Sequence, residues 1–191
     1  MFTSRIVIFL AAMFWLPATA WAEPLSYNYV ELDYLDLDTD VAGVNFDGDG
    51  WAVGGSAEFA PNWYVLGRYA DSELERSTID LDLEQITLGA GYHVETGDVT
   101  SFFGNLTFED IDIDVADDSG FGLEGGARFA LGSRVELGAS LKYLDVGDVV
   151  DGELGFKLSS VVDVHESIGL TLDFESIDDL DVISLGGRVY F

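Results

Sequence analysis

The chain ends with Ser184-Leu185-Gly186-Gly187-Arg188-Val189-Tyr190-Phe191, and its architecture follows most directly from this stretch. Successive side chains of a β-strand point to opposite faces. One face of this strand would therefore carry Ile183, Leu185, Gly187, Val189 and Phe191. The charged side chain of Arg188 would lie on the other face. The stretch thus predicts a terminal strand with one apolar and one polar side.

Four residues of this strand resemble the terminal β-signal of bacterial outer-membrane barrels. They are a polar residue, a glycine two positions later, and apolar residues at the third-last and last positions: Ser184, Gly186, Val189 and Phe191. The resemblance implies that barrel assembly machinery, together with periplasmic chaperones, handles this strand before it closes against the first one. It also implies that the apolar face contacts lipid.

The other end of the chain predicts export. Arg5 precedes an apolar run at residues 6–16, which is followed by the small-x-small sequence Ala20-Trp21-Ala22. This is the pattern of a secretory signal peptide. An anchoring helix is the alternative, but the run falls short of the roughly 20 apolar residues that span a bilayer. We therefore expect residues 1–22 to be cleaved, leaving residues 23–191 as one barrel domain.

Composition excludes several classes of protein. The chain has no cysteine, so disulfides and thiol-based metal sites are excluded. Its net charge of −28 argues against nucleic-acid binding, which needs basic residues to neutralise phosphates. Acidity of this size often accompanies disorder, but 48% hydrophobic and 13% aromatic residues are too many for a disordered chain.

Alternating polarity predicts an all-β fold, a single antiparallel up-and-down transmembrane β-barrel of about ten strands. An even number of strands is typical of bacterial barrels. The strands are expected near residues 26–36, 50–60, 62–71, 84–94, 99–109, 120–131, 133–144, 152–162, 167–175 and 181–191.

The predicted connections are alternately short and long. The short ones, at 60–62, 95–98, 131–133 and 163–166, would lie with both chain ends on the periplasmic side. The long ones, at 37–49, 72–83, 110–119, 145–151 and 176–180, would face the cell exterior. These loops would be acidic, since they contain Asp38, Asp40, Asp47, Asp49, Asp112, Asp114, Asp117 and Asp118.

Sorting each predicted strand by parity separates apolar from charged residues. The apolar face would contact lipid, and a basic residue placed there near the midplane would cost about 2–4 kcal/mol. The charged residues fall on the opposite, lumenal face, where they would form a network: Glu31, Asp33, Glu58, Arg68, Glu124, Arg128, Arg134, Glu136, Lys142, Glu153, Lys157, Asp173 and Arg188.

A soluble two-sheet sandwich also alternates in this way, so the aromatic residues must decide. On the apolar face they gather at two heights, as in the paired girdles of membrane barrels. One row would comprise Tyr34, Trp51, Tyr69, Phe108, Phe121, Tyr143 and Phe174, and the other Phe59, Trp63, Tyr92, Phe102, Phe129 and Phe191. A sandwich core would place its largest rings at mid-strand, so the rows favour the barrel.

No segment predicts catalysis, a cofactor or a resident metal. The stretch 45–50 resembles the opening of a calcium loop, but Ser56 stands where a bidentate carboxylate is needed. Weak divalent-cation binding among the acidic loops is the remaining cation hypothesis. His93 is expected to be a hydrogen-bonded residue of the lumen, and His165 to lie in a periplasmic turn, so neither resembles a hydrolase centre at the outer rim.

The lumenal charges leave two hypotheses open. Small barrels are filled by side chains, and ten strands lie near that closed limit. The charges could pair across the narrow interior and rigidify it, because an unpaired buried charge is costly. Alternatively, lumenal glycines leave room for a narrow cation-preferring pore, whose acidic mouth would concentrate cations.

Three stretches resemble a family of small xanthomonad-type outer-membrane proteins once discussed as secreted signals: residues 25–31, 50–69 and 88–92. The resemblance implies an outer-membrane barrel, also shed in vesicles, with no catalytic residue to carry over. The leading hypothesis is a structural or surface-interacting barrel whose acidic loops bridge lipopolysaccharide through divalent cations. The alternatives are the pore and a secreted soluble β-protein that acts as a signal.

Overall fold

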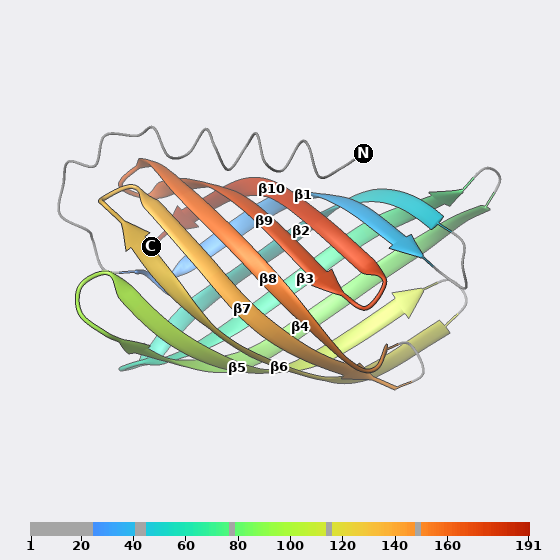
Figure 1. Cartoon of the computed structure of the whole chain (residues 1–191), viewed down its shortest axis with the longest axis horizontal. Coiled ribbons are helices and arrows are strands. Elements are labelled where there is room, and N and C mark those ends of the chain that lie inside the picture. Colours follow the sequence, from blue (N-terminus) through green and yellow to red (C-terminus); the bar gives the residue numbers. More distant parts are fainter. Residues whose placement is uncertain (1–24, 41–44, 77–78, 114–115, 148–149) are drawn as a thin grey trace.

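The alternating sequence folds into a closed antiparallel β-barrel, seen in a computed structural model that describes residues 25–40, 45–76, 79–113, 116–147 and 150–191 (Figure 1). The expected signal peptide, residues 1–22, lies outside these ranges. Within them, no helix is long and apolar enough to cross a membrane. The predicted all-β barrel is confirmed, and the soluble two-sheet sandwich is excluded by closure of the sheet.

The barrel has ten strands. They are β1 (Tyr29–Asp40), β2 (Asn45–Ala60), β3 (Trp63–Arg76), β4 (Ile79–Glu95), β5 (Thr100–Ile113), β6 (Ala116–Leu131), β7 (Val135–Val146), β8 (Val150–His165), β9 (Ile168–Ile177) and β10 (Leu180–Tyr190). Each strand pairs with its neighbours in sequence, and β1 pairs with β10 to close the barrel. This is the predicted up-and-down order.

The two ends of the barrel are named here by the chain termini. The near end holds the start of the described chain, the C-terminus and the turns at 61–62, 96–99, 132–134 and 166–167 (Figure 1). Asn62, Gly97 and Gly132 take a left-handed backbone in these turns, at φ of 69°, 70° and 72°. The far end is the opposite one, where β1 to β6 continue four or five residues beyond their predicted limits and β7 to β10 one or two.

The predicted long loops are mostly strand, which is the main correction to the sequence-based expectation. β2 begins at Asn45 rather than 50, and β4 at Ile79 rather than 84. Most of the acidic residues assigned to loops therefore lie in strands: Asp38, Asp40, Asp47, Asp49, Asp112, Asp117 and Asp118. Asp114 lies outside the described residues.

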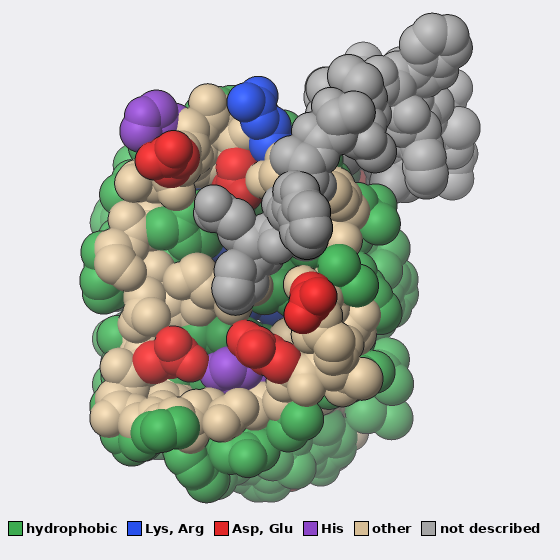
Figure 2. Space-filling view, turned by 90° about the vertical axis from the view of Figure 1, so that its left-hand side faces the viewer, with side chains coloured by type: hydrophobic (Ala, Val, Ile, Leu, Met, Phe, Trp, Pro, Cys, Tyr) green, Lys and Arg blue, Asp and Glu red, His purple; other side chains and the backbone are tan. Residues whose placement is uncertain are grey.

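Over the middle of the barrel the outer wall is apolar, as the parity of the sequence predicts. Leu32, Leu88, Leu106, Leu141 and Leu154 are each more than half exposed. Figure 2, which views the barrel from the near end, shows hydrophobic side chains along the outside of the wall. Such a surface is typical of strands that face lipid.

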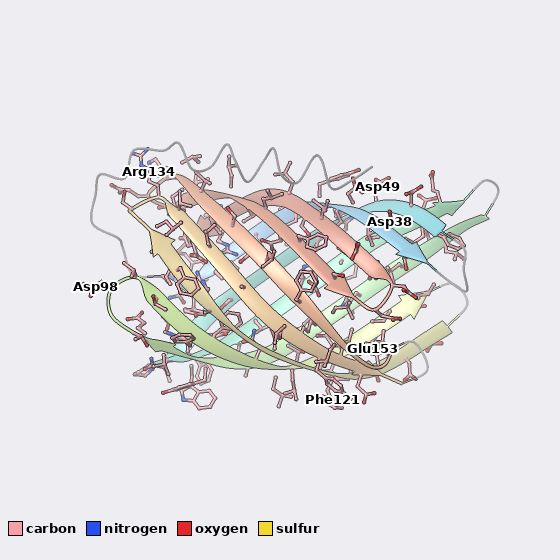
Figure 3. The ribbon with its side chains drawn as sticks, viewed as in Figure 1. Asp38, Asp49, Asp98, Phe121, Arg134 and Glu153 are labelled. Carbon is pink, nitrogen blue, oxygen red and sulfur yellow. The ribbon has the colours of Figure 1, made fainter. Side chains whose placement is uncertain are left out.

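Exposed aromatic rings border this apolar zone. Toward the near end, the rings of Trp63 and Tyr92 lie 4.9 Å apart. Toward the far end, Trp51 and Tyr69 lie 5.5 Å apart. Phe121, also in the far row, points away from the barrel (Figure 3). The predicted pair of aromatic rows is therefore present on the outer wall.

Beyond the far aromatic row the two faces of the sheet exchange character. We call this part the far rim, and it comprises residues 35–40, 45–50, 71–76, 79–85, 110–113, 116–119, 144–146, 150–152, 175–177 and 180–182. Many of its inward side chains are apolar, and they belong to two buried clusters, the first of which extends to Ala52 and Ala70 just inside the rim. One is built on Leu35, Leu37, Phe46, Ala52, Ala70 and Leu74, the other on Ile111, Leu144, Val146 and Ile177.

The outward side chains of the far rim are carboxylates in register. Asp36 lies opposite Asp49, which lies opposite Glu73, which lies opposite Asp82. A second row runs from Asp71 through Glu84 and Asp112 to Asp117. The labelled Asp38 and Asp49 mark this acidic end in Figure 3. The far rim thus has the apolar-in, polar-out pattern of a sheet in water.

Candidate functional site

The near mouth of the barrel is occupied by the segment that precedes β1. Tyr27 is only 4% exposed, and its ring stacks on His93 with centroids 4.1 Å apart. The Arg128 guanidinium lies 4.4 Å from the same ring. The Tyr27 hydroxyl is hydrogen bonded to Ser101 at 2.9 Å. Residues 25–28 are therefore anchored inside the mouth.

His93 lies in this cluster as the sequence predicts. It is buried, and its Nε2 lies 2.6 Å from Oε1 of Glu58. Figure 2 shows histidine and acidic side chains around this mouth. Glu58 also accepts a hydrogen bond from Nδ2 of Asn28 at 3.2 Å. The network at the mouth thus joins β2, β4 and the segment before β1.

Three ion pairs connect lumenal residues that the sequence singled out. Arg128 on β6 contacts Glu136 on β7, with Nε–Oε1 and Nη2–Oε2 distances of 2.6 and 2.8 Å. Lys157 on β8 lies 2.8 Å from Asp173 on β9. Arg188 on β10 lies 2.8 Å from Glu31 on β1.

The expected pairing across the interior is therefore wrong for these three pairs, which join neighbouring strands. Side chains directly opposite each other on adjacent strands are only about 5 Å apart at Cβ, so neighbours meet first. Lys142 on β7 has the longer reach, because its Nζ lies 3.3 Å from Glu175 on β9 and 3.9 Å from Glu109 on β5.

Glu109 is a central residue that the sequence-based prediction missed. It is fully buried, and its carboxylate accepts hydrogen bonds from Gln85 at 3.2 Å, Thr87 at 2.6 Å and Thr107 at 2.7 Å. It lies at the predicted limit of its strand and is absent from the predicted lumenal network. Its parity opposite the apolar Phe108 was the signal that could have found it.

The remaining predicted network residues differ in their surroundings. Glu124 accepts hydrogen bonds from Asn105 at 2.9 Å and Ser140 at 2.6 Å. Asp33 is buried and accepts one from Thr171 at 2.9 Å. Arg68 lies inside the barrel opposite Gly54. Glu153 lies opposite the buried Leu144, near the far rim.

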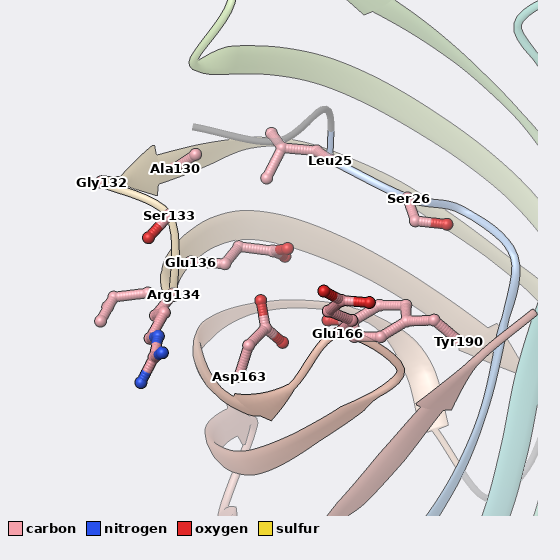
Figure 4. Close-up of a pocket in the computed structure, with 11 residues that line it drawn as sticks. Leu25, Ser26, Ala130, Gly132, Ser133, Arg134, Glu136, Asp163, Glu166 and Tyr190 are labelled. Atoms are coloured by element: carbon pink, nitrogen blue, oxygen red, sulfur yellow. The ribbon is translucent and has the colours of Figure 1, made fainter. Parts of the chain in front are cut away.

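The predicted lumenal position of Arg134 is wrong. β7 begins at Val135, so Arg134 lies in the near-end turn and is exposed. Figure 3 shows it at that end. The turn borders a small cavity of about 110 Å³ (Figure 4). Its lining residues are Leu25, Ser26, Ala130, Gly132, Ser133, Arg134, Val135, Glu136, Asp163, Glu166 and Tyr190.

The calcium-loop resemblance has no counterpart in the structure. Residues 45–50 are the start of β2, with Phe46 buried and Asp47 and Asp49 exposed on the extended strand. In the described part of the chain, no group of three or more His, Asp or Glu side chains is arranged to hold a metal ion.

Of the four residues of the expected assembly signal, Ser184, Gly186 and Val189 lie in β10, and Phe191 directly follows it. Ser184 faces the lumen and is buried, and Gly186 lies opposite Asp33. Val189 and Phe191 are exposed on the outer wall. The backbone N–H of Phe191 donates to the Asn28 carbonyl at 3.3 Å, so the chain end is tied to the segment that precedes β1.

Comparison with solved structures supports the fold. An outer-membrane channel from Pseudomonas putida F1 matches with a TM-score of 0.54 and 9% identity, covering 92% of this chain and 99% of that one. The translocator domain of the autotransporter NalP from Neisseria meningitidis matches with a TM-score of 0.50 and 11% identity, covering 99% and 95%. Neisserial surface protein A gives a TM-score of 0.46 and 16% identity, covering 87% and 98%.

None of these three structures is named as an enzyme. Comparison with curated protein sequences gave no significant match. A family model described as the outer membrane protein beta-barrel domain matches residues 7–174, which is most of the chain. The protein is thus a barrel of the outer membrane. The closed barrel of ten strands, its apolar outer wall and this match show that the chain belongs to the outer-membrane β-barrel domain family.

Proposed function

We propose that the protein is a structural or surface-interacting barrel whose far rim stands outside the bilayer and faces the cell exterior. The exchange of polarity at the far aromatic row carries this proposal. On the near-end side of this row the outward side chains are apolar, and beyond the row they are carboxylates such as Asp36 and Asp49. A bilayer suits the first surface, and water or lipid headgroups suit the second.

The interior favours a filled barrel over the alternative, a narrow cation-preferring pore. Residues 25–28 occupy the near mouth, ion pairs follow, and two apolar clusters lie inside the far rim. Apolar side chains in contact with one another offer no polar partner to a dehydrated ion. The acidic far mouth is the feature that favours the pore.

Single-channel recording tests the two against each other. We expect the refolded protein to give no discrete conductance steps in a planar bilayer, in preparations whose insertion is verified by spectroscopy and by their shift on unboiled gels. Cation-selective steps that shrink when far-rim carboxylates are neutralised would establish the pore instead.

Cysteine labelling tests the position of the far rim, because the chain has no native cysteine. Leu32 and Asp36 lie on the same face of β1, on either side of the far aromatic row. On intact cells we expect a membrane-impermeant maleimide to label Asp36→Cys and not Leu32→Cys. Asp98→Cys, in a near-end turn, should react only after permeabilisation. Labelling of Asp98→Cys from outside would reverse the orientation.

We also propose that lipopolysaccharide surrounds the far rim, with divalent cations between its phosphates and the facing carboxylates. Two carboxylates directly opposite each other on a sheet repel, and a cation between them relieves this cost. We expect Mg²⁺ to raise the melting temperature more in vesicles that contain lipopolysaccharide than in phospholipid vesicles. An equal Mg²⁺ effect in both would contradict a lipopolysaccharide bridge.

Removal of residues 1–22 belongs to the same proposal, since an exported barrel begins after its signal peptide. The mass of protein extracted from outer membranes would then correspond to residues 23–191. The apolar outer wall opposes a freely soluble secreted signal, so any release from cells would take place in membrane vesicles.

A further inference from the structure

The barrel closes at a seam that no turn aligns. Every other pair of neighbouring strands is joined by a short connection, which fixes how the two strands align. β1 and β10 meet only after the rest of the chain has folded. They pair from Tyr29 opposite Tyr190 to Thr39 opposite Leu180. The alignment of this seam must therefore be set by the side chains on the two strands.

The apolar outer wall can exclude only half of the wrong alignments. A slip by one residue turns every side chain of β10 to the opposite face and would put Arg188 into lipid. A slip by two residues keeps every side chain on its own face. The lipid-facing residues are then still apolar, so the lumenal residues must discriminate.

One lumenal pair fits in the observed alignment alone. Arg188 lies directly opposite Glu31, with Nη2 and Nε 2.8 and 3.1 Å from Oε2, and both side chains are largely buried. Its guanidinium also lies 3.9 Å from the centre of the Tyr29 ring. A two-residue slip would put Gly186 or Tyr190 opposite Glu31. In either case this buried carboxylate would no longer face its cation.

The next lumenal row adds a steric condition. Asp33, Gly186 and Thr171 lie side by side on β1, β10 and β9. The Asp33 carboxylate passes over Gly186 and accepts a hydrogen bond from the Thr171 hydroxyl at 2.9 Å. A Cβ atom at position 186 would overlap both this carboxylate and the Leu32 carbonyl. At Gly187, on the outer face, the nearest atom would be 3.8 Å from a Cβ.

We propose that Glu31, Asp33, Gly186 and Arg188 form a register lock that selects one alignment of the closing seam. The lock acts while the barrel closes and is independent of the proposed surface role. Gly186 and Arg188 would thus help to align β10 with β1. This role is separate from any recognition of the last strand by assembly machinery.

Refolding into phospholipid vesicles without other proteins tests the lock, with cysteine pairs as reporters of alignment. Val30→Cys with Val189→Cys cross-links in the observed alignment. Val30→Cys with Gly187→Cys, and Leu32→Cys with Val189→Cys, cross-link in the two slipped ones. The measured quantities are the folded fraction on unboiled gels and, within the folded band, the ratio of native to slipped cross-links.

Two matched pairs of variants isolate the lock. Gly186→Ala is compared with Gly187→Ala. Glu31→Gln is compared with Glu136→Gln, which breaks an equally buried pair inside a hairpin. We expect Gly186→Ala and Glu31→Gln to lower the cross-link ratio about tenfold or more, or to abolish folding, because each leaves a buried charge without its partner or space. The two controls should keep the native ratio.

The lock would be overturned if Gly186→Ala and Glu31→Gln folded with the native cross-link ratio. Equal losses in the lock variants and their controls would overturn it as well. Such a result would mean that any lumenal disturbance, and not the seam, limits closure. If the far rim proved not to be exposed at the cell surface in the labelling experiment, the cross-link ratios would not change. The surface role and the register lock can therefore fail independently.

Discussion

At the scale of single residues, Glu109 is held from several sides in the interior. It is fully buried, accepts hydrogen bonds from three side chains and lies 3.9 Å from the Lys142 ammonium. Glu109→Ala would leave the buried Thr107 hydroxyl and the partly buried Gln85 and Thr87 donors without their acceptor. We expect it to lower the free energy of unfolding by about 3 kcal/mol.

The neighbouring Asp110 provides the control for Glu109. It is exposed on the outer face of the same strand, so Asp110→Ala should change the free energy of unfolding by less than about 0.5 kcal/mol. Urea unfolding from vesicles, followed by tryptophan fluorescence, measures both variants. Similar losses for the two would show that Glu109 is not the acceptor that holds this part of the lumen.

The sequence could predict which way a residue points, but not which partner it meets. Parity places Arg128, Lys157 and Arg188 inside the barrel, where they are found. Their partners depend on the alignment of adjacent strands, which side-chain alternation leaves open in steps of two residues. Arg134 shows the other limit, because one residue at a strand boundary separates a lumenal side chain from an exposed turn.

At the scale of the element, the terminal strand has two proposed roles, which are alignment of the closing seam and recognition during assembly. The second role can be tested separately at the last residue. Phe191 is 73% exposed on the outer wall and contributes little to the interior. If it serves as an assembly signal, Phe191→Ala should reduce the amount of folded barrel in cells several-fold and leave refolding in vesicles unchanged. Phe59→Ala, at another strongly exposed aromatic of the near end (63% against 73%), is the matched control.

The amount of heat-modifiable protein in outer-membrane fractions measures this effect in cells. Equal yields of the Phe191→Ala and Phe59→Ala proteins would remove Phe191 from the signal. A loss that also appeared in vesicle refolding would assign it a structural role instead.

Strand boundaries were predictable at the near end and not at the far end, for a physical reason. Near-end strands stop at turn residues such as Asn62 and Gly132, whose left-handed backbone ends the ladder. At the far rim the alternation of apolar and polar residues continues, but there the apolar side chains point inward and the polar ones outward. Segments such as 45–50 are rich in Asp and Gly, which strands usually avoid. They therefore resembled loops, although Phe46 and Leu74 bury their side chains and keep the sheet intact.

At the scale of the whole molecule, charge is divided by position along the barrel. The chain carries a net charge of −28, yet both of its lysines, together with Arg128 and Arg188, face acids inside the lumen. The excess of acid is concentrated outside, where carboxylates on adjacent strands stand directly opposite one another. Charges inside the barrel are thus largely paired, whereas the carboxylates on the outside of the far rim repel one another.

Repulsion at the far rim predicts that salt stabilises the protein. Facing like charges on a sheet cost about 0.2–1 kcal/mol per pair, and this cost falls as ions screen it. The free energy of unfolding in vesicles should therefore rise as NaCl increases from roughly 0.05 to 0.5 M. The double variant D36N/D49N removes two facing pairs, Asp36–Asp49 and Asp49–Glu73, so it should be more stable at low salt and respond less to added salt.

The variant E95Q/D98N separates local repulsion from net charge. It also removes two negative charges, but at the near end, where Glu95 lies opposite Ser101 and Asp98 lies in a turn. If the salt effect arises from facing carboxylates, this variant should keep the salt slope of the unaltered protein. Equal flattening of the slope in both variants would show that total charge governs stability. The facing carboxylates of the far rim would then not lower the free energy of unfolding by local repulsion. Relief of that repulsion would no longer support cation bridging at the far rim.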